Sequence, residues 1–169
     1  QTKFSIQSIS KVLQLIIAFE QRGADVWRRV GVEPSGTPFN SLVQLEYDRG
    51  IPRNPMINAG AIVVCDMLLS DLEEPKQKLL DFICQIAGNP CIRSNEKVAA
   101  SELAVAYHNR ALINLMKALG NIENGLEEVL DLYFFMCAIE MNCEELSRAF
   151  LFLANDGTDP LSQTNILSL

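Results

Sequence analysis

The stretch Gln7-Ser8-Ile9-Ser10-Lys11 opens a strongly apolar segment of the chain. The apolar residues that follow Lys11 are Val12, Leu13, Leu15, Ile16, Ile17, Ala18 and Phe19. This pattern predicts a helix over residues 8–22 that ends at Gly23. Because helical residues three apart share a face, Ser8 and Lys11 should have Cβ atoms roughly 5–6 Å apart. A serine at a helix N-terminus also faces the positive end of the helix dipole, which favours an oxyanion there.

The pair Ser8 and Lys11 has the spacing of a nucleophile and its base. A lysine in that position can hydrogen-bond the serine hydroxyl and, if desolvated, take its proton. The S-x-x-K spacing is the signature of serine acyl-transfer enzymes of the β-lactamase and penicillin-binding type. The pattern also matches Ser94-Asn95-Glu96-Lys97, in a polar stretch typical of a helix start. The alternative for the first match is that Ser8 is a helix N-cap and Lys11 is a solvated charge. The apolar helix that follows Lys11 favours the catalytic interpretation instead.

Composition restricts the class of protein. The 169 residues correspond to one domain or part of one, and 49% are hydrophobic, enough for a substantial core. The net charge is −7 and no basic patch is present, which disfavours nucleic acid as a partner. No apolar run approaches the roughly 20 residues that a membrane helix needs, so we expect no membrane partner.

The cysteines indicate a reducing compartment. There are five, an odd number at irregular spacings, and most lie within apolar helical patterns: Cys65, Cys84, Cys91, Cys137 and Cys143. We therefore expect buried, reduced thiols in a cytoplasmic protein. The spacing from Cys137 to Cys143 matches no zinc signature and His108 is the one histidine, so we expect no metal site.

The rest of the chain is predicted to be predominantly helical. Small apolar residues after Asn58 indicate a buried helix that other elements approach closely. Further helices are expected over residues 24–30, 72–87, 95–119, 123–140 and 143–155, and a short strand or extended edge over 41–47. The fold class is thus mainly α, with at most one or two short strands.

Four polar residues lie where packing would favour apolar ones. Asn58 precedes the buried helix, Glu102 and Asn109 share a face of the predicted 95–119 helix, and Tyr133 lies in an apolar run. The structural alternatives are an N-cap for Asn58, a solvated helix face for Glu102 and Asn109, and a core aromatic for Tyr133.

Together these residues suit an α-amino acid substrate with a side-chain amide. Glu102 could accept hydrogen bonds from the substrate ammonium. Asn58, Asn109 and Tyr133 could donate to the carboxylate. Ser8 at a helix start could supply both a nucleophile and part of an oxyanion hole.

Long strings of the chain closely resemble the serine-dependent glutaminases. They are Phe4-Ser5-Ile6-Gln7-Ser8-Ile9-Ser10-Lys11, Trp27-Arg28-Arg29-Val30-Gly31-Val32-Glu33-Pro34-Ser35-Gly36, Pro38-Phe39-Asn40-Ser41 and Pro52-Arg53-Asn54-Pro55-Met56-Ile57-Asn58-Ala59-Gly60-Ala61-Ile62. The match continues in order through Ser101-Glu102, Asn109-Arg110, Asp131-Leu132-Tyr133 and Leu153-Ala154-Asn155-Asp156-Gly157. The resemblance covers essentially the whole chain.

The resemblance implies hydrolysis of L-glutamine to L-glutamate and ammonia on a β-lactamase-like fold, with no metal or organic cofactor. It implies that Ser8 is the nucleophile, that its amide donates to the oxyanion, and that Lys11 is the base. The substrate-binding positions it implies are Ser8, Asn58, Glu102, Asn109 and Tyr133. It also implies a homo-oligomer, either a dimer or a tetramer.

The chain departs from the family at its ends. A family member continues downstream with a Gly-Met-Tyr-type segment and a Lys-Ser-Gly-Val-Gly-Gly-type stretch, and this chain contains no K-[ST]-G string. We therefore expect residues 1–169 to be a single, partial glutaminase domain. It would be the helical part of an α/β (α+β) serine β-lactamase-like fold with most sheet strands missing. The alternative function is a catalytically incomplete fragment that acts as a binding or assembly module. The absent later motifs disfavour a penicillin-recognising protein.

Overall fold

The apolar segment after Ile57 forms the central helix α3 (Asn58–Asp71) in the computed structural model, which describes residues 2–167. All of its residues from Ala59 to Leu68 are buried. At Gly60 a Cβ would lie 2.0 Å from the Asn54 carbonyl oxygen, so only glycine allows this close approach. The predicted buried helix with close neighbours is therefore confirmed.

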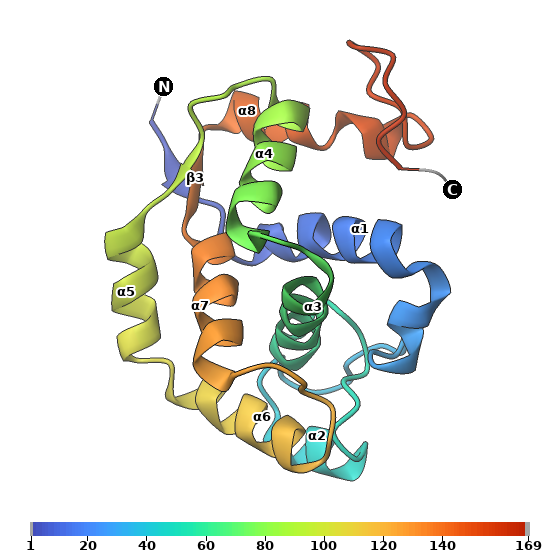
Figure 1. Ribbon diagram of the computed structural model, residues 1–169, viewed down its shortest axis with the longest axis vertical. Coiled ribbons are helices and arrows are strands. Elements are labelled where there is room, and N and C mark those ends of the chain that lie inside the picture. Colours follow the sequence, from blue (N-terminus) through green and yellow to red (C-terminus); the bar gives the residue numbers. More distant parts are fainter. Residues whose placement is uncertain (1, 168–169) are drawn as a thin grey trace.

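Two helices that pack against α3 carry the candidate residues Lys11 and Tyr133. Helix α1 (Ser10–Arg22) crosses α3 on one side, and α7 (Leu126–Cys137) packs on another, so that α3 is seen end-on between them in Figure 1. The remaining helical segments are η1 (Gln7–Ile9), η2 (Gly23–Arg28), α2 (Leu42–Tyr47), α4 (Pro75–Ala87), α5 (Glu96–Ala104), α6 (Tyr107–Ala118), α8 (Cys143–Ala149) and η3 (Leu151–Ala154).

A short antiparallel sheet joins the start of the chain to the end of α7. Its strands are β1 (Phe4–Ser5), β2 (Arg93–Ser94) and β3 (Ile139–Met141), in the order β1-β3-β2. Ser5 pairs with Glu140, and the Ile6 amide donates to the Ile139 carbonyl at 2.9 Å. Because β1 leads directly into η1, this sheet holds Ser8 beside the end of α7.

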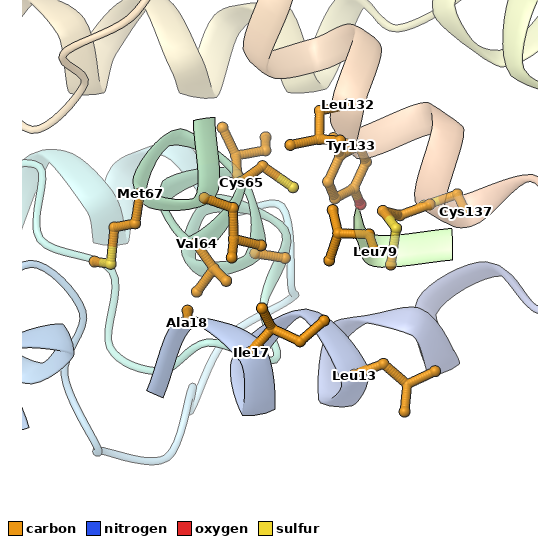
Figure 2. Close-up of a cluster of buried hydrophobic side chains, with 14 of the residues drawn as sticks. Leu13, Ile17, Ala18, Val64, Cys65, Met67, Leu79, Leu132, Tyr133 and Cys137 are labelled. Carbon is orange, nitrogen blue, oxygen red and sulfur yellow. The ribbon is translucent and has the colours of Figure 1, made fainter. Parts of the chain in front are cut away.

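The core lies where α1, α3, α4 and α7 meet. Figure 2 shows side chains from all four helices in contact there, among them Leu13, Ile17, Val64, Cys65, Leu79, Leu132, Tyr133 and Cys137. Full burial of a leucine or isoleucine side chain stabilises a fold by about 1.5–3 kcal/mol. The site residues on α1, α3 and α7 are therefore held in place by the close-packed core.

The predominantly helical fold is confirmed, but the strand or edge predicted over residues 41–47 is wrong. This segment is helix α2, and the Ser41 hydroxyl caps it by accepting from the Gln44 amide at 3.3 Å. Val43 and Tyr47 are exposed. The N-cap serine decided the local structure. Within residues 2–167 the sheet has three short strands, one more than expected.

The single helix predicted over residues 95–119 is also wrong. It is divided at Val105 and Ala106 into α5, which packs on α7, and α6, which packs on α3 and α2 as well as on α7. One straight helix could not reach these partners on different sides. Glu102 and Asn109 therefore do not share a helix face.

The predictions for the last third of the chain hold less closely. The helix expected over 123–140 ends at Cys137 and gives way to β3, and that expected over 143–155 is α8 followed by η3. All five cysteines are free, as expected, but Cys91 and Cys143 are exposed and Cys84 is half-buried, so the expectation of burial was wrong for those three. In the described part of the chain, no helix is long and apolar enough to cross a bilayer.

Candidate active site

Lys11 is the most unusual charged group of the site. Its side chain lies on the inner face of α1 and the residue is only 2% exposed. Nζ donates to the Met56 carbonyl at 3.1 Å and to Asn58 Oδ1 at 2.8 Å, and it lies 5.9 Å from the centre of the Phe39 ring. Burial lowers the pKa of Lys11, because its partners are neutral oxygens. The solvated-charge alternative for Lys11 is therefore wrong.

Ser8 lies one helical turn before Lys11, in η1, and is exposed. Ile9 and Ser10 both have right-handed helical dihedral angles, so the chain from Ser8 to Lys11 keeps the i, i+3 relation. Ser8 caps neither η1 nor α1, whose N-cap positions are Ile6 and Ile9. The N-cap alternative for Ser8 is wrong, and its hydroxyl is accessible.

Asn58 links Lys11 to Asn109. Its Oδ1 accepts from Lys11, and its Nδ2 donates to Asn109 Oδ1 at 3.3 Å. The N-cap of α3 is Ile57, so Asn58 is not a cap, and Asn109 is half-buried on the first turn of α6 rather than on a solvated face. The structure thus brings three predicted site residues from α1, α3 and α6 into one hydrogen-bonded row.

Glu102 is connected to Ser8 through Gln7, a residue that the sequence analysis did not assign to the site. Glu102 is half-buried near the end of α5, and its Oε1 accepts from Gln7 Nε2 at 2.5 Å. Gln7 also has a φ of 51°, a left-handed conformation that is rare without glycine. Such strain clusters at functional sites. Its position directly before Ser8 was the only sequence signal.

Tyr133 and Cys137 form the floor of the site on α7. Figure 2 shows them one helical turn apart, and their side chains are hydrogen-bonded to each other. Burial raises the pKa of Tyr133 far above its ordinary value and raises the pKa of Cys137 to about 11, so both groups are neutral at pH 7. Tyr133 is buried, as the core-aromatic alternative expects, and the Glu102 carboxylate adds to the rise of its pKa.

No metal-ligating cluster accompanies these groups in the part of the chain that the structure covers: His, Cys, Asp and Glu side chains form no set of three within residues 2–167. A buried lysine with neutral partners, one turn after an accessible serine, is the arrangement typical of serine acyl-transfer enzymes with a β-lactamase-like fold.

The chain matches the Glutaminase family model over residues 1–169 and belongs to the glutaminase family. It is 56% identical over 165 residues to a glutaminase of Saccharophagus degradans, covering 98% of this chain and 54% of that protein. A glutaminase of Christiangramia forsetii is 54% identical over 157 residues, covering 93% of this chain and 52% of the relative.

The fold agrees with solved structures of the same family. The crystal structure of a probable glutaminase of Bacillus subtilis superposes with a TM-score of 0.93 at 37% identity, over 99% of this chain and 55% of that one. The chain therefore has the helical part of the β-lactamase-like fold, as predicted. It spans about half the length of the curated relatives that it matches.

Proposed function

We propose that this chain carries the nucleophile, the base and several substrate-binding residues for hydrolysis of L-glutamine to L-glutamate and ammonia. Membership of the glutaminase family supports the reaction. The observation that carries the mechanism is the buried amine of Lys11, which is hydrogen-bonded to two neutral oxygens.

The partners of Lys11 suit a neutral base. A neutral amine has two N–H groups and one lone pair. The Met56 carbonyl and Asn58 Oδ1 each accept one of these N–H groups. The lone pair of Nζ is then free to accept a proton. Because the pKa of Lys11 is lowered, this neutral form is easier to reach than in water. The Ser8 hydroxyl, one turn earlier, is the proton donor for that lone pair.

In the proposed reaction, Ser8 Oγ attacks the side-chain carbonyl carbon of glutamine and its proton passes to Lys11 Nζ. The Ser8 amide donates to the oxyanion. The C–N bond then breaks, and the leaving nitrogen takes the proton from Lys11 and departs as ammonia. Water attacks the resulting glutamyl ester, gives a proton to Lys11, and releases glutamate while Ser8 Oγ regains its proton.

The substrate's α-amino acid end would bind between α5, α6 and α7. Glu102 accepts from the ammonium. Asn109 Oδ1 is occupied by Asn58, so the Asn109 Nδ2–H groups are available for the carboxylate. The Tyr133 hydroxyl stays protonated because burial raises its pKa, and on binding it would turn from Cys137 to donate to the carboxylate.

We further propose a cytoplasmic homo-oligomer, either a dimer or a tetramer, that works without metal, organic cofactor, nucleic acid or membrane. Five free thiols support the reducing compartment. Exposed apolar side chains, among them Val43 and Tyr47 on α2 and Val105 and Tyr107 at the junction of α5 and α6, support association with another copy.

The test is ammonia release from L-glutamine, measured for residues 1–169 and for the longest natural polypeptide that contains them. Activity in the longer polypeptide that is lost in Ser8→Ala supports the proposal. Undiminished activity in Ser8→Ala would exclude Ser8 as the nucleophile. Inactivity of both wild-type proteins would favour the alternative, a catalytically incomplete binding or assembly module.

A further inference from the structure

A row of buried side chains runs from the middle of α3 to the peptide that precedes Ser8. The Cys65 thiol donates to Gln14 Oε1 at 3.3 Å, and Gln14 Nε2 donates to Ser10 Oγ at 3.2 Å. Ser10 Oγ donates to the Gln7 carbonyl at 2.8 Å. Cys65, Gln14 and Ser10 are all fully buried. We refer to Cys65, Gln14 and Ser10 as the buried hydrogen-bond chain.

The three hydrogen bonds of this chain run in one direction, from the Cys65 thiol to the Gln7 carbonyl. The Cys65 thiol needs an acceptor, so it selects the carbonyl oxygen of Gln14 as its neighbour. The amide nitrogen of Gln14 must then face Ser10, where it donates to the hydroxyl oxygen. Because its oxygen accepts from Gln14, the Ser10 hydroxyl uses its hydrogen to donate, and the Gln7 carbonyl accepts it at 2.8 Å; the Cys137 sulfur is a second partner of this hydroxyl. A core of apolar residues would need none of these polar atoms, and each costs free energy to bury without a partner.

The peptide at the end of the chain is the strained one. Gln7 has a φ of 51°, and a non-glycine residue in such a conformation is strained and persists only where its surroundings determine it. Ser10 holds its carbonyl, and Glu102 holds its side chain. The conformation of Gln7 sets the direction in which the chain enters Ser8.

We propose that Ser10 and Gln14 are positioning residues, which hold the Gln7 peptide in its left-handed conformation and so present the Ser8 hydroxyl to Lys11. The inference rests on the proposed function of Ser8 as the nucleophile. Neither residue touches a reacting atom, and both act through Gln7. Cys65 contributes to this positioning because its thiol donates to Gln14 Oε1 and so orients the Gln14 amide.

The test uses the longest natural polypeptide that contains this chain, with ammonia release from L-glutamine as the assay. Ser10→Ala removes the hydroxyl donor to the Gln7 carbonyl and leaves the Ser10 amide donor in place. It should lower kcat about tenfold with KM changed less than about threefold, because the nucleophile is misplaced. Ser10→Thr keeps the hydroxyl and should regain most of kcat. Gln14→Met keeps the side-chain volume but removes the hydrogen bond to Ser10 Oγ, so that the Ser10 hydroxyl can rotate. This variant should lower kcat about threefold.

The matched control is Ile17→Val, a small truncation in the buried face of the same helix α1 that leaves the buried hydrogen-bond chain intact. It should lower thermal stability without lowering kcat, which separates positioning from stability. Gln14→Met provides the comparison if Ser10→Ala does not fold. A kcat for Ser10→Ala within about twofold of wild type, or no gain in Ser10→Thr, would overturn the proposal.

A second readout does not depend on activity. In a crystal structure of Ser10→Ala, the φ of Gln7 should leave the left-handed region; an unchanged φ would overturn the inference. If the wild-type polypeptide releases no ammonia, the proposed function fails while the geometry of Gln7 still decides the role of Ser10. The two failures are therefore distinguishable.

Discussion

Two of the charged side chains buried within residues 2–167, Asp66 and Lys11, have opposite kinds of partner. The Asp66 carboxylate on α3 is fully buried and bonds to the Arg29 guanidinium at 2.5 Å, to the amides of Glu123 and Asn124, and to the Asn124 side chain. The Lys11 amine has two neutral acceptors and no carboxylate in ion-pair contact within residues 2–167. One charge is fully compensated, and the other is not.

The two pKa values move accordingly. Burial alone would raise the pKa of Asp66, but the hydrogen bonds from Arg29, Asn124 and Glu123 hold it below the ordinary value, so the charged form is retained. Burial lowers the pKa of Lys11, so the charged form is disfavoured. The paired charge of Asp66 connects α3 to the loop after α6 through Glu123 and Asn124. The amine of Lys11, which has only neutral partners, can lose its proton more easily. The comparison distinguishes a structural charge from a reactive one.

The largest effect is expected from Lys11→Met in the longest natural polypeptide. Loss of a general base should lower kcat for glutamine about 10²–10⁴-fold. The unfolding free energy should change by less than about 1.5 kcal/mol, because removal of the amine's burial cost offsets the donors lost by Met56 and Asn58. Ammonia assays and urea unfolding measure the two quantities. A large loss of stability with activity retained would reverse the roles assigned to the two charges.

Asp66→Asn should have the opposite profile. Arg29 would lose its buried partner, which typically costs about 3–5 kcal/mol of unfolding free energy. The control is Asp71→Asn on the same helix, where the Arg22–Asp71 pair is more exposed and should cost about 1 kcal/mol or less. Urea unfolding of residues 1–169 compares the two variants. Equal losses would show that the Asp66 cluster is no more important than a surface pair.

The fold could be predicted where local signals and packing agree. The helix after Ser8 and the buried helix after Ile57 follow from continuous apolar patterns that end at Gly23 and Leu72. The break between α5 and α6 could not be predicted, because it depends on which helices each half contacts. Helix α2 was missed although Ser41 is a typical N-cap, because the helix has only six residues and one of them, Leu45, is buried.

The site could be predicted in its residue types but not in its connections. The resemblance identified Ser8, Lys11, Asn58, Glu102, Asn109 and Tyr133, and their roles stay predictions. Gln7 was missed because its importance arises from a backbone angle and from a contact with a residue 95 positions away. Asp66 had a readable signal, a carboxylate within the apolar run Val64-Cys65-Asp66-Met67-Leu68, which indicates a buried charge with a partner.

The two charges should govern stability at opposite ends of the pH scale. The folded pKa of Asp66 is below the ordinary value, so its contribution is present above that value and lost as pH falls through the folded pKa. The folded pKa of Lys11 is below 10.5, so the unfolded state binds more protons in that window and stability rises as pH increases toward 10.5. Thermal unfolding of wild type against Lys11→Met should isolate the alkaline rise, and Asp66→Asn the acidic loss. A parallel pH dependence for wild type and Lys11→Met would contradict the buried amine.

The smallest effect should come from giving Lys11 a carboxylate partner, so that its charge is paired as that of Arg29 is paired by Asp66. Asn58→Asp places a negative charge 2.8 Å from Nζ, where Asn58 Oδ1 now accepts, and should raise the pKa of Lys11. The pH dependence of kcat/KM should then move upward by about one pH unit, since an opposite charge at this distance typically shifts a pKa by that amount or more. Asn58→Ala is the control, because it removes the amide without adding charge and should lower kcat/KM without an upward shift. A profile that does not move in Asn58→Asp would mean that the titration of Lys11 does not limit the reaction, and the contrast between the two buried charges would then be structural only.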